Sequence, residues 1–181
     1  MTLVIAARCK DGCVVVSDKR QHIISNGGKY HEDGYEKVRI AGPFVVYNHG
    51  YNRIDDQDWK LKLDELTPDL NNPIYKKIQQ EMGSKHNKKA FYVFLNKKVF
   101  HEISIDADGS ITLETEKNNE LHKSGKGSVY VDFSTLKDIK KKKMEKVKNE
   151  MKRIFSEAHD RLKKDNGDEF SKECEVKCFG G

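Results

Sequence analysis

The sequence predicts an α+β fold built around antiparallel β-sheets. Short apolar segments rich in Val and Ile alternate in blocks with segments of helical periodicity, a pattern typical of layered sheets and helices. Lys10-Asp11-Gly12 lies between two apolar segments, and Asp-Gly is a typical hairpin turn. Apolar residues also recur at intervals of three and four from 144 to 162, which indicates one long amphipathic helix. Because no repeat or linker divides the chain, residues 1–181 are expected to form a single domain.

The first half of the chain is expected to hold two hairpins and two short helices. The first hairpin joins strands at 2–8 and 13–18, and the second joins 37–40 and 44–47 around Gly42-Pro43. Glycines at 27, 28 and 34 indicate a loop between the hairpins. Residues 53–66 have an imperfect helical pattern that stops before Pro68, and Pro73 is expected to begin a second helix that ends at Gly83.

The second half returns to strands before its long helix. Strands are expected at 90–95, 99–105 and 110–114, because β-prone runs there are separated by polar turns. The long helix is expected over 135–165, with Ser134 or Thr135 as its N-cap and Asn166-Gly167 at its end. A last strand is expected at 174–179.

Charge and hydropathy favour a cytoplasmic protein that has no membrane segment. Hydrophobic residues make up 36% of the chain and charged residues 35%, and no apolar run approaches the ~20 residues of a membrane span. The net charge of +5 is concentrated between Lys137 and Arg153, including the four lysines 140–143. Such a run is typical of a solvated helix face, so no nucleic-acid partner is expected.

The start of the chain has the residue types of an activated nucleophile. If Met1 is removed, as expected before a small residue, Thr2 carries a hydroxyl and a free α-amine. An α-amine titrates near neutral pH, so it can accept the hydroxyl proton without a second side chain. A lysine nearby would favour the neutral amine by charge repulsion, and a carboxylate would hold that lysine in place.

At these residues the chain resembles the proteasome β subunits, which are N-terminal-nucleophile hydrolases. Thr2, the Lys-Asp-Gly turn and the segment Ser17-Asp18-Lys19-Arg20 match the opening of that family. The resemblance implies a four-layer αββα sandwich with two antiparallel sheets between helix layers. It also implies that Thr2 is the nucleophile, that Asp18 orients the lysine of Lys37-Val38, and that the backbone N–H of Gly50 is the oxyanion donor.

Later motifs of the family match with substitutions. The Gly-Ser-Gly-Ser loop of the family corresponds to Gly125-Lys126-Gly127-Ser128, so Lys126 replaces the serine nearer the threonine amine and Ser128 keeps the second position. The Asp-x-x-Ser motif corresponds to Asp168 and Ser171, although Lys172-Glu173 replaces the Gly-Gly that follows it. The resemblance implies that the site includes all four polar side chains: Lys126, Ser128, Asp168 and Ser171.

The opening Thr-Leu-Val-Ile-Ala is also similar to that of the connectases, which transfer peptides through the same threonine. The resemblances therefore imply a threonine-type peptidase that acts on peptides or unfolded proteins without a cofactor, in a homo-oligomer or a ring of related subunits. A transpeptidase that uses the same acyl-enzyme and a catalytically degenerate ring subunit are the alternatives. His49, with Asn48 and Tyr35, is a candidate to line the substrate cleft.

The four cysteines form two C-x3-C pairs, Cys9 with Cys13 and Cys174 with Cys178. This spacing is weaker support for zinc than paired C-x2-C motifs. The histidines show no paired metal spacing. No metal is expected, and the cysteines are interpreted as small buried apolar residues.

Overall fold

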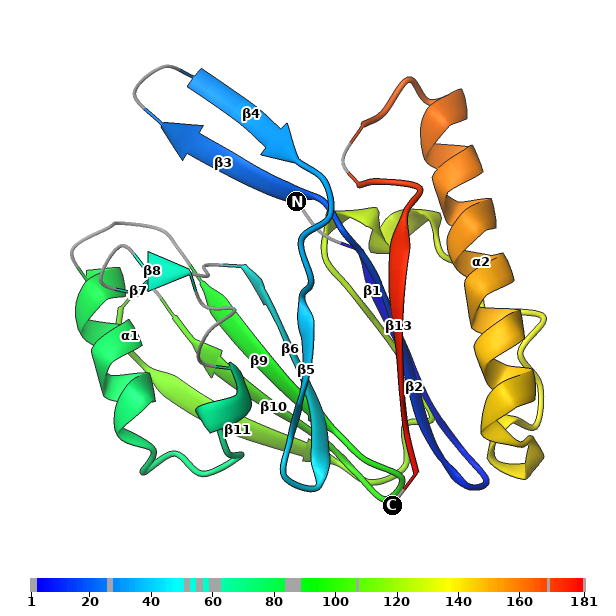
Figure 1. Cartoon of the computed structure of the whole chain (residues 1–181). Helices are drawn as coiled ribbons and strands as arrows, with labels where there is room; N and C mark the ends of the chain where they lie inside the picture. The colour runs from blue at the N-terminus through cyan, green and yellow to red at the C-terminus, as the bar shows by residue number, and fades with distance from the viewer. Residues whose placement is uncertain are drawn as a thin grey trace. The chain divides into compact units, whose positions relative to one another are not determined.

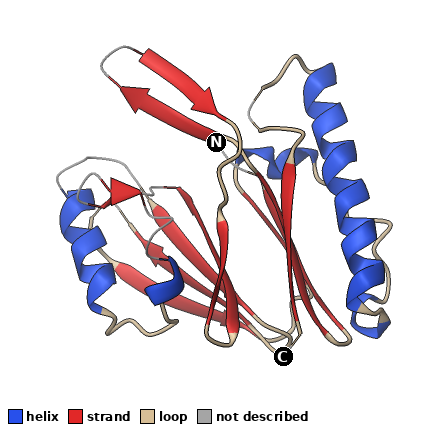
Figure 2. Cartoon of the chain, viewed as in Figure 1, coloured by secondary structure: helices blue, strands red, loops and turns tan. Residues whose placement is uncertain are grey.

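The computed structural model describes residues 3–25, 28–50, 53–54, 57–58, 63–83, 89–106, 108–168 and 170–180. By their contacts they form two compact units, one made of Met1–Lys37 with Glu120–Gly181 and the other of Val38–Asn119. Figure 1 labels the α-helices and most of the strands, and Figure 2 separates strands from helices by colour. Thr2 lies outside the described residues.

The first unit contains a four-stranded antiparallel sheet in the order β12-β1-β2-β13. Its strands are β1 (Val4–Cys9), β2 (Gly12–Asp18), β12 (Leu121–Ser124) and β13 (Cys174–Phe179). A separate hairpin joins β3 (Gln21–Ser25) to β4 (Gly28–Glu32). The same unit contains the 3-10 helices η3 (Lys126–Tyr130) and η4 (Ile139–Lys141) and the α-helix α2 (Met144–Lys164).

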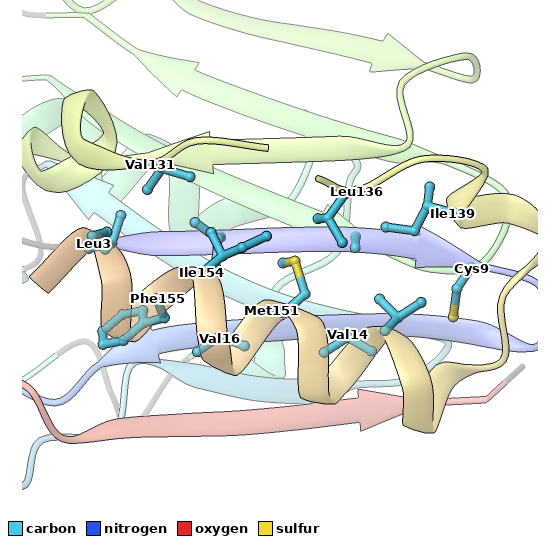
Figure 3. Packing of buried hydrophobic residues seen from close by; sticks show 14 of the residues in the cluster. Leu3, Cys9, Val14, Val16, Val131, Leu136, Ile139, Met151, Ile154 and Phe155 are labelled. Carbon is cyan, nitrogen blue, oxygen red and sulfur yellow. The ribbon is translucent and has the colours of Figure 1, made fainter. Parts of the chain in front are cut away.

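Helix α2 covers one face of this sheet and buries its apolar stripe there (Figure 3). Alternate residues of β1 and β2 face the helix, among them Leu3, Ile5, Val14 and Val16. Burial of each large apolar side chain in such a core contributes about 1.5–3 kcal/mol. The helix side of the contact consists of Val147, Met151, Ile154, Phe155, Ala158 and Leu162, which recur at intervals of three and four.

Both ends of α2 have a clear physical cause. The backbone N–H of Met144 donates to Asp11 Oδ1 at 2.7 Å, so the turn between β1 and β2 caps the helix. At the other end Asn166 is left-handed (φ 56°), and the N–H of Gly167 donates to the carbonyl of Leu162 at 2.9 Å. This pattern is a Schellman motif, which ends the helix where Asn166-Gly167 predicts.

The second unit contains a five-stranded antiparallel sheet in the order β11-β10-β9-β6-β5. Its elements are β5 (Val38–Ala41), β6 (Phe44–Gly50), β7 (Arg53–Ile54), β8 (Gln57–Asp58), η2 (Leu63–Glu65), α1 (Pro73–Gly83), β9 (Ala90–Leu95), β10 (Phe100–Ile105) and β11 (Ile111–Glu116). Helices α1 and η2 form the core on one face of the sheet, with Leu63, Tyr75, Ile78, Tyr92 and Phe94 fully buried.

The expected four-layer αββα sandwich is wrong. The described residues are mostly β, in antiparallel sheets of four and five strands, and they contain two α-helices. Two stretches expected to be helical are not: residues 53–66 contribute β7, β8 and η2 to the described part, and 135–143 form turns and η4 before α2 begins. Strands β3, β4 and β12 were not predicted either, and β3 and β4 form a hairpin where glycines indicated a loop.

Among the described residues, no helix combines the length and the hydropathy of a membrane-spanning segment. The basic run falls mainly on η4 and the start of α2. Three of the four lysines 140–143 form ion pairs, Lys140 with Glu120, Lys141 with Asp138 and Lys142 with Glu150.

Candidate functional site

Asp18 is the buried acceptor around which the candidate site is built. It ends β2, and the β1–β2 hairpin brings it back beside Leu3. The backbone N–H of Leu3 donates to Asp18 Oδ1 at 2.8 Å, and the N–H of Asp18 donates to the carbonyl of Leu3 at 3.0 Å. Arg20 N–H donates to Asp18 Oδ2 at 3.0 Å. The carboxylate is fully buried, and these backbone donors stabilise its charge.

Lys37 completes a buried ion pair with this carboxylate. Its Nζ lies 2.8 Å from each oxygen of Asp18, and the residue is 5% exposed. Burial lowers the pKa of the Lys37 ammonium, while the charge of Asp18 and the hydrogen bonds to it act in the opposite direction. The structure therefore joins the Leu3 amide, Asp18 and Lys37 in one continuous hydrogen-bonded chain.

Glu175, on β13, is a second buried carboxylate at this position. Its Oε1 accepts a short hydrogen bond from the backbone N–H of Lys37. In the sheet register Glu175 lies opposite Ser17, the residue that precedes Asp18. Its charge also favours the ammonium form of Lys37.

Arg20 links the site to two loops. Its guanidinium forms a bidentate pair with Asp33, with Nε to Oδ1 at 2.8 Å and Nη2 to Oδ2 at 3.0 Å. Nη1 lies 2.6 Å from Asp168 Oδ1 and also donates to the Asp168 carbonyl at 3.1 Å. Lys163 Nζ lies 2.8 Å from the same Asp168 oxygen. Arg20, which is itself mostly buried, therefore connects Asp168 to Asp18.

The charges around Asp168 predict a pH effect on stability. Hydrogen bonds from Lys163 and Arg20 lower the pKa of Asp168 to about 2, below the value of about 3.9 for an unfolded chain. The stabilisation is therefore present above about pH 4 and is lost as the pH falls towards about 2. We expect Asp168→Asn to flatten the pH dependence of the free energy of unfolding between pH 4 and 2, measured by urea unfolding.

The matched control is Asp165→Asn, because Asp165 is exposed and its carboxylate makes no ion pair within the described part of the chain. If the free energy of unfolding depends on pH equally in Asp168→Asn, in wild type and in this control, the Arg20–Asp168 contact does not contribute to stability.

Ser171 binds the segment that follows Asp18. Its hydroxyl accepts from the backbone N–H of Lys19 at 3.2 Å and donates to the carbonyl of Glu173 at 2.9 Å. It is 4% exposed. Ser171 therefore fixes the backbone next to the Asp18–Lys37 pair.

The Gly125–Ser128 segment lies against the start of β1. A Cβ on Gly127 would lie 2.7 Å from the Phe170 ring and 2.9 Å from Leu3 Cβ, so only glycine allows this close approach. Lys126 is exposed and Ser128 is half-buried. Just before this segment, Ser124 lies opposite Val4 in the β1–β12 register and is 7% exposed. The Ser124 hydroxyl has no hydrogen-bond partner among the described residues.

Gly50 belongs to the second unit, at the end of β6. Its φ of 85° favours glycine, and a Cβ there would overlap the Lys89 carbonyl oxygen. The neighbouring His49 ring stacks on Phe91 with ring centroids 4.5 Å apart, and Asn48 is mostly buried. Tyr35, in the first unit, donates its N–H to the Lys19 carbonyl.

The cysteines are free thiols in the sheet that α2 covers. Burial raises the pKa of Cys13 to about 12, so its thiol is protonated at neutral pH. Over the described ranges, no group of three His, Cys, Asp or Glu residues is placed to hold a metal ion.

Sequence reasoning assigned no role to Arg20, Asp33, Ser124 or Glu175. Arg20 was within the motif that carried the resemblance, and a carboxylate in the last strand could have drawn attention to Glu175. The contacts of these residues span up to 148 residues of sequence, so no local pattern encodes them.

Comparison with known proteins identifies structural rather than sequence relatives. No protein-family model and no curated protein matches the chain. Among solved structures, Anbu (ancestral beta-subunit) from Yersinia bercovieri is similar, with a TM-score of 0.63 and 12% identity, covering 99% of this chain and 81% of that one. This chain has the fold of Anbu. A second Anbu, from Hyphomicrobium sp. strain MC1, has a TM-score of 0.61 and 12% identity over 99% of this chain and 82% of its own.

The Anbu likeness corrects the family resemblance inferred from the sequence. Assignment to the proteasome β subunits or to the connectases has no support from sequence families, and the structural neighbours described above are Anbu proteins. At 12% identity, the likeness to Anbu establishes the fold alone.

Proposed function

We propose that this chain is a threonine-type amide-bond hydrolase in which Thr2, freed of Met1, is the nucleophile. The observation that carries the proposal is the hydrogen bond of 2.8 Å from the Leu3 N–H to Asp18, whose carboxylate also binds the buried ammonium of Lys37. The Leu3 nitrogen forms the peptide bond with the carbonyl of Thr2. A buried carboxylate–lysine pair is thus hydrogen-bonded to the amide that attaches the proposed nucleophile to the fold.

In the proposed reaction the Thr2 Oγ attacks the carbonyl carbon of a substrate amide, and the α-amine of Thr2 accepts the hydroxyl proton. The tetrahedral intermediate collapses as the α-ammonium donates that proton to the leaving nitrogen, so the C–N bond breaks and an ester to Thr2 remains. Water then attacks the ester with the same amine as base, which releases the acid and restores Thr2.

Lys37 and its partners adjust the amine in this proposal. The ammonium of Lys37 disfavours a second positive charge nearby and so favours the neutral, basic form of the α-amine. Asp18 holds Lys37 in place, while Ser171 and Asp168 stabilise the backbone beside it, Asp168 through Arg20. The roles of Gly50 as oxyanion donor and of Lys126 and Ser128 in the site remain predictions from the sequence.

The wider setting is part of the proposal. We expect a single domain in the cytoplasm that acts on peptides or unfolded proteins in a homo-oligomer or a ring with related subunits. The fold likeness to a protein described as an ancestral beta-subunit supports assembly.

Two mass measurements test the proposal. The intact mass of the purified protein should lack Met1, and incubation with a peptide library plus an amine such as glycinamide should give hydrolysis products. Products that carry the added amine would identify a transpeptidase on the same acyl-enzyme. A retained Met1, or no product of either kind, would contradict the proposal and leave a non-catalytic subunit.

A further inference from the structure

Glu175 is a buried carboxylate that the proposed reaction does not use. It is 8% exposed, although the neighbouring Glu173 on the same segment is exposed. Its Oε1 accepts from the backbone N–H of Lys37, across 138 residues of sequence. A buried carboxylate is costly unless it is hydrogen-bonded and paired with a cation, so this placement requires an explanation.

The sheet register explains how Glu175 reaches Lys37. Strand β13 pairs with β2 so that Glu175 lies opposite Ser17 and Cys174 lies opposite Asp18. Cross-strand partners share a face of the sheet, and the same row continues from Ser17 to Val4. The hydroxyl of Ser17 donates to the carbonyl of Asp18 at 3.1 Å. Glu175 therefore lies beside Ser17, the residue before Asp18, and a hydrogen bond joins it to the Lys37 backbone.

Charged groups from three positions surround Lys37. Burial lowers the pKa of the Lys37 ammonium, and Arg20 acts in the same direction, whereas the negative charges of Asp18 and Glu175 oppose this shift. Arg20 is already engaged by Asp33 and Asp168. Asp18 therefore binds the Lys37 ammonium directly, and Glu175 binds the backbone N–H of the same residue.

We propose that Glu175 is a positioning residue for the reaction at Thr2: its Oε1 fixes the peptide of Lys37, and its carboxylate is the second negative charge beside that residue. This inference rests on the proposed function, because Lys37 matters to catalysis only if the Thr2 amine is the base. Through Glu175, strand β13 would contribute to the pH range in which the protein is active.

Glu175→Gln tests the charge separately from the hydrogen bond, because the amide oxygen of Gln can still accept from the Lys37 N–H. Without the negative charge, Lys37 should lose its proton at lower pH. We expect the titration of Lys37, followed by the ¹³Cε signal that disappears in Lys37→Arg, to move down by about one pH unit. The alkaline limb of kcat/KM against pH, measured on a peptide cleaved in the library test, should move in the same direction.

Glu173→Gln is the matched control, since it removes the same charge from an exposed neighbour, and it should move neither curve. A Lys37 titration that stays in place in Glu175→Gln overturns the inference, whatever the activity. A variant that loses rate uniformly, with both curves unmoved, has only a structural role and overturns it equally. The proposed function fails by a different result, namely activity that persists in Thr2→Ala.

Discussion

Replacing Thr2 by Ala is expected to reduce peptide hydrolysis by at least about 10³-fold, to the background of the assay. Removal of a nucleophile typically costs several orders of magnitude in kcat, because the covalent route is lost entirely. The α-amine remains in this variant, but it has no hydroxyl to deprotonate. The measurement is the initial rate of peptide cleavage, compared with wild type at equal protein concentration.

Thr2→Ser provides the matched control for this variant. It keeps a hydroxyl on the same carbon and should retain measurable activity. Leu3 makes the backbone hydrogen bonds that attach this end of the chain to Asp18 and keeps them in the variant, so circular dichroism and the Tm of Thr2→Ala should match wild type. Undiminished hydrolysis by Thr2→Ala would show that the chemistry lies elsewhere in the chain.

Replacing Asp18 by Ala is expected to lower the free energy of unfolding by about 3–5 kcal/mol. The change leaves the Lys37 ammonium buried without its closest counter-ion, which is the costly way to break a buried pair. It also removes the acceptor of two backbone N–H groups, those of Leu3 and Arg20. Urea unfolding followed by circular dichroism measures the difference.

Two comparisons make this stability test specific. Glu145→Ala breaks an exposed pair with Lys148 at the start of α2 and should cost less than about 1 kcal/mol. Adding Lys37→Met to Asp18→Ala removes the unpaired charge and should recover part of the lost stability, while activity stays absent. Equal losses for Asp18→Ala and Glu145→Ala would mean that the buried pair does not stabilise the fold.

Local chemistry in the sequence was enough to predict much of the secondary structure. Asp11-Gly12 predicted the first hairpin, Pro73 the start of α1, and the apolar stripe the body of α2. In each case the signal is local: a turn that needs particular residues, a fixed φ at a helix start, or a period of three to four. Asn26-Gly27, between the segments that form β3 and β4, was a hairpin signal of the same kind, and the interpretation as a loop overlooked it.

What the sequence did not predict depends on tertiary contacts. Helix α2 begins at Met144 instead of 135 because Asp11, from a distant turn, accepts the first free N–H. The segment 53–66 had an imperfect helical period, and its buried residues Leu63 and Leu66 pack in η2 and just after it. These local errors, together with a family resemblance that had no support from sequence families, produced the wrong layer arrangement.

The residues of the candidate site also fall into those that local motifs predicted and those that only tertiary contacts reveal. Asp18 and Lys37 were selected from short motifs near the start of the chain, and the structure places them in contact. Glu175 and Asp168, the partner of Arg20, come from the C-terminal part of the chain. The pairing of β13 with β2 places Glu175 opposite Ser17, and a hydrogen bond joins it to Lys37. A polar residue in a strand does not by itself specify which partner the sheet will supply.

The central claim is that the hydroxyl of Thr2 forms an ester with the substrate acyl group, and trapping that ester tests it most directly. The protein is mixed with an activated peptide ester, quenched in acid within seconds and analysed by intact mass and fragment mapping. We expect a protein without Met1 that carries one acyl group on Thr2, and no adduct in Thr2→Ala. An adduct that maps to another residue, or that persists in Thr2→Ala, would contradict it.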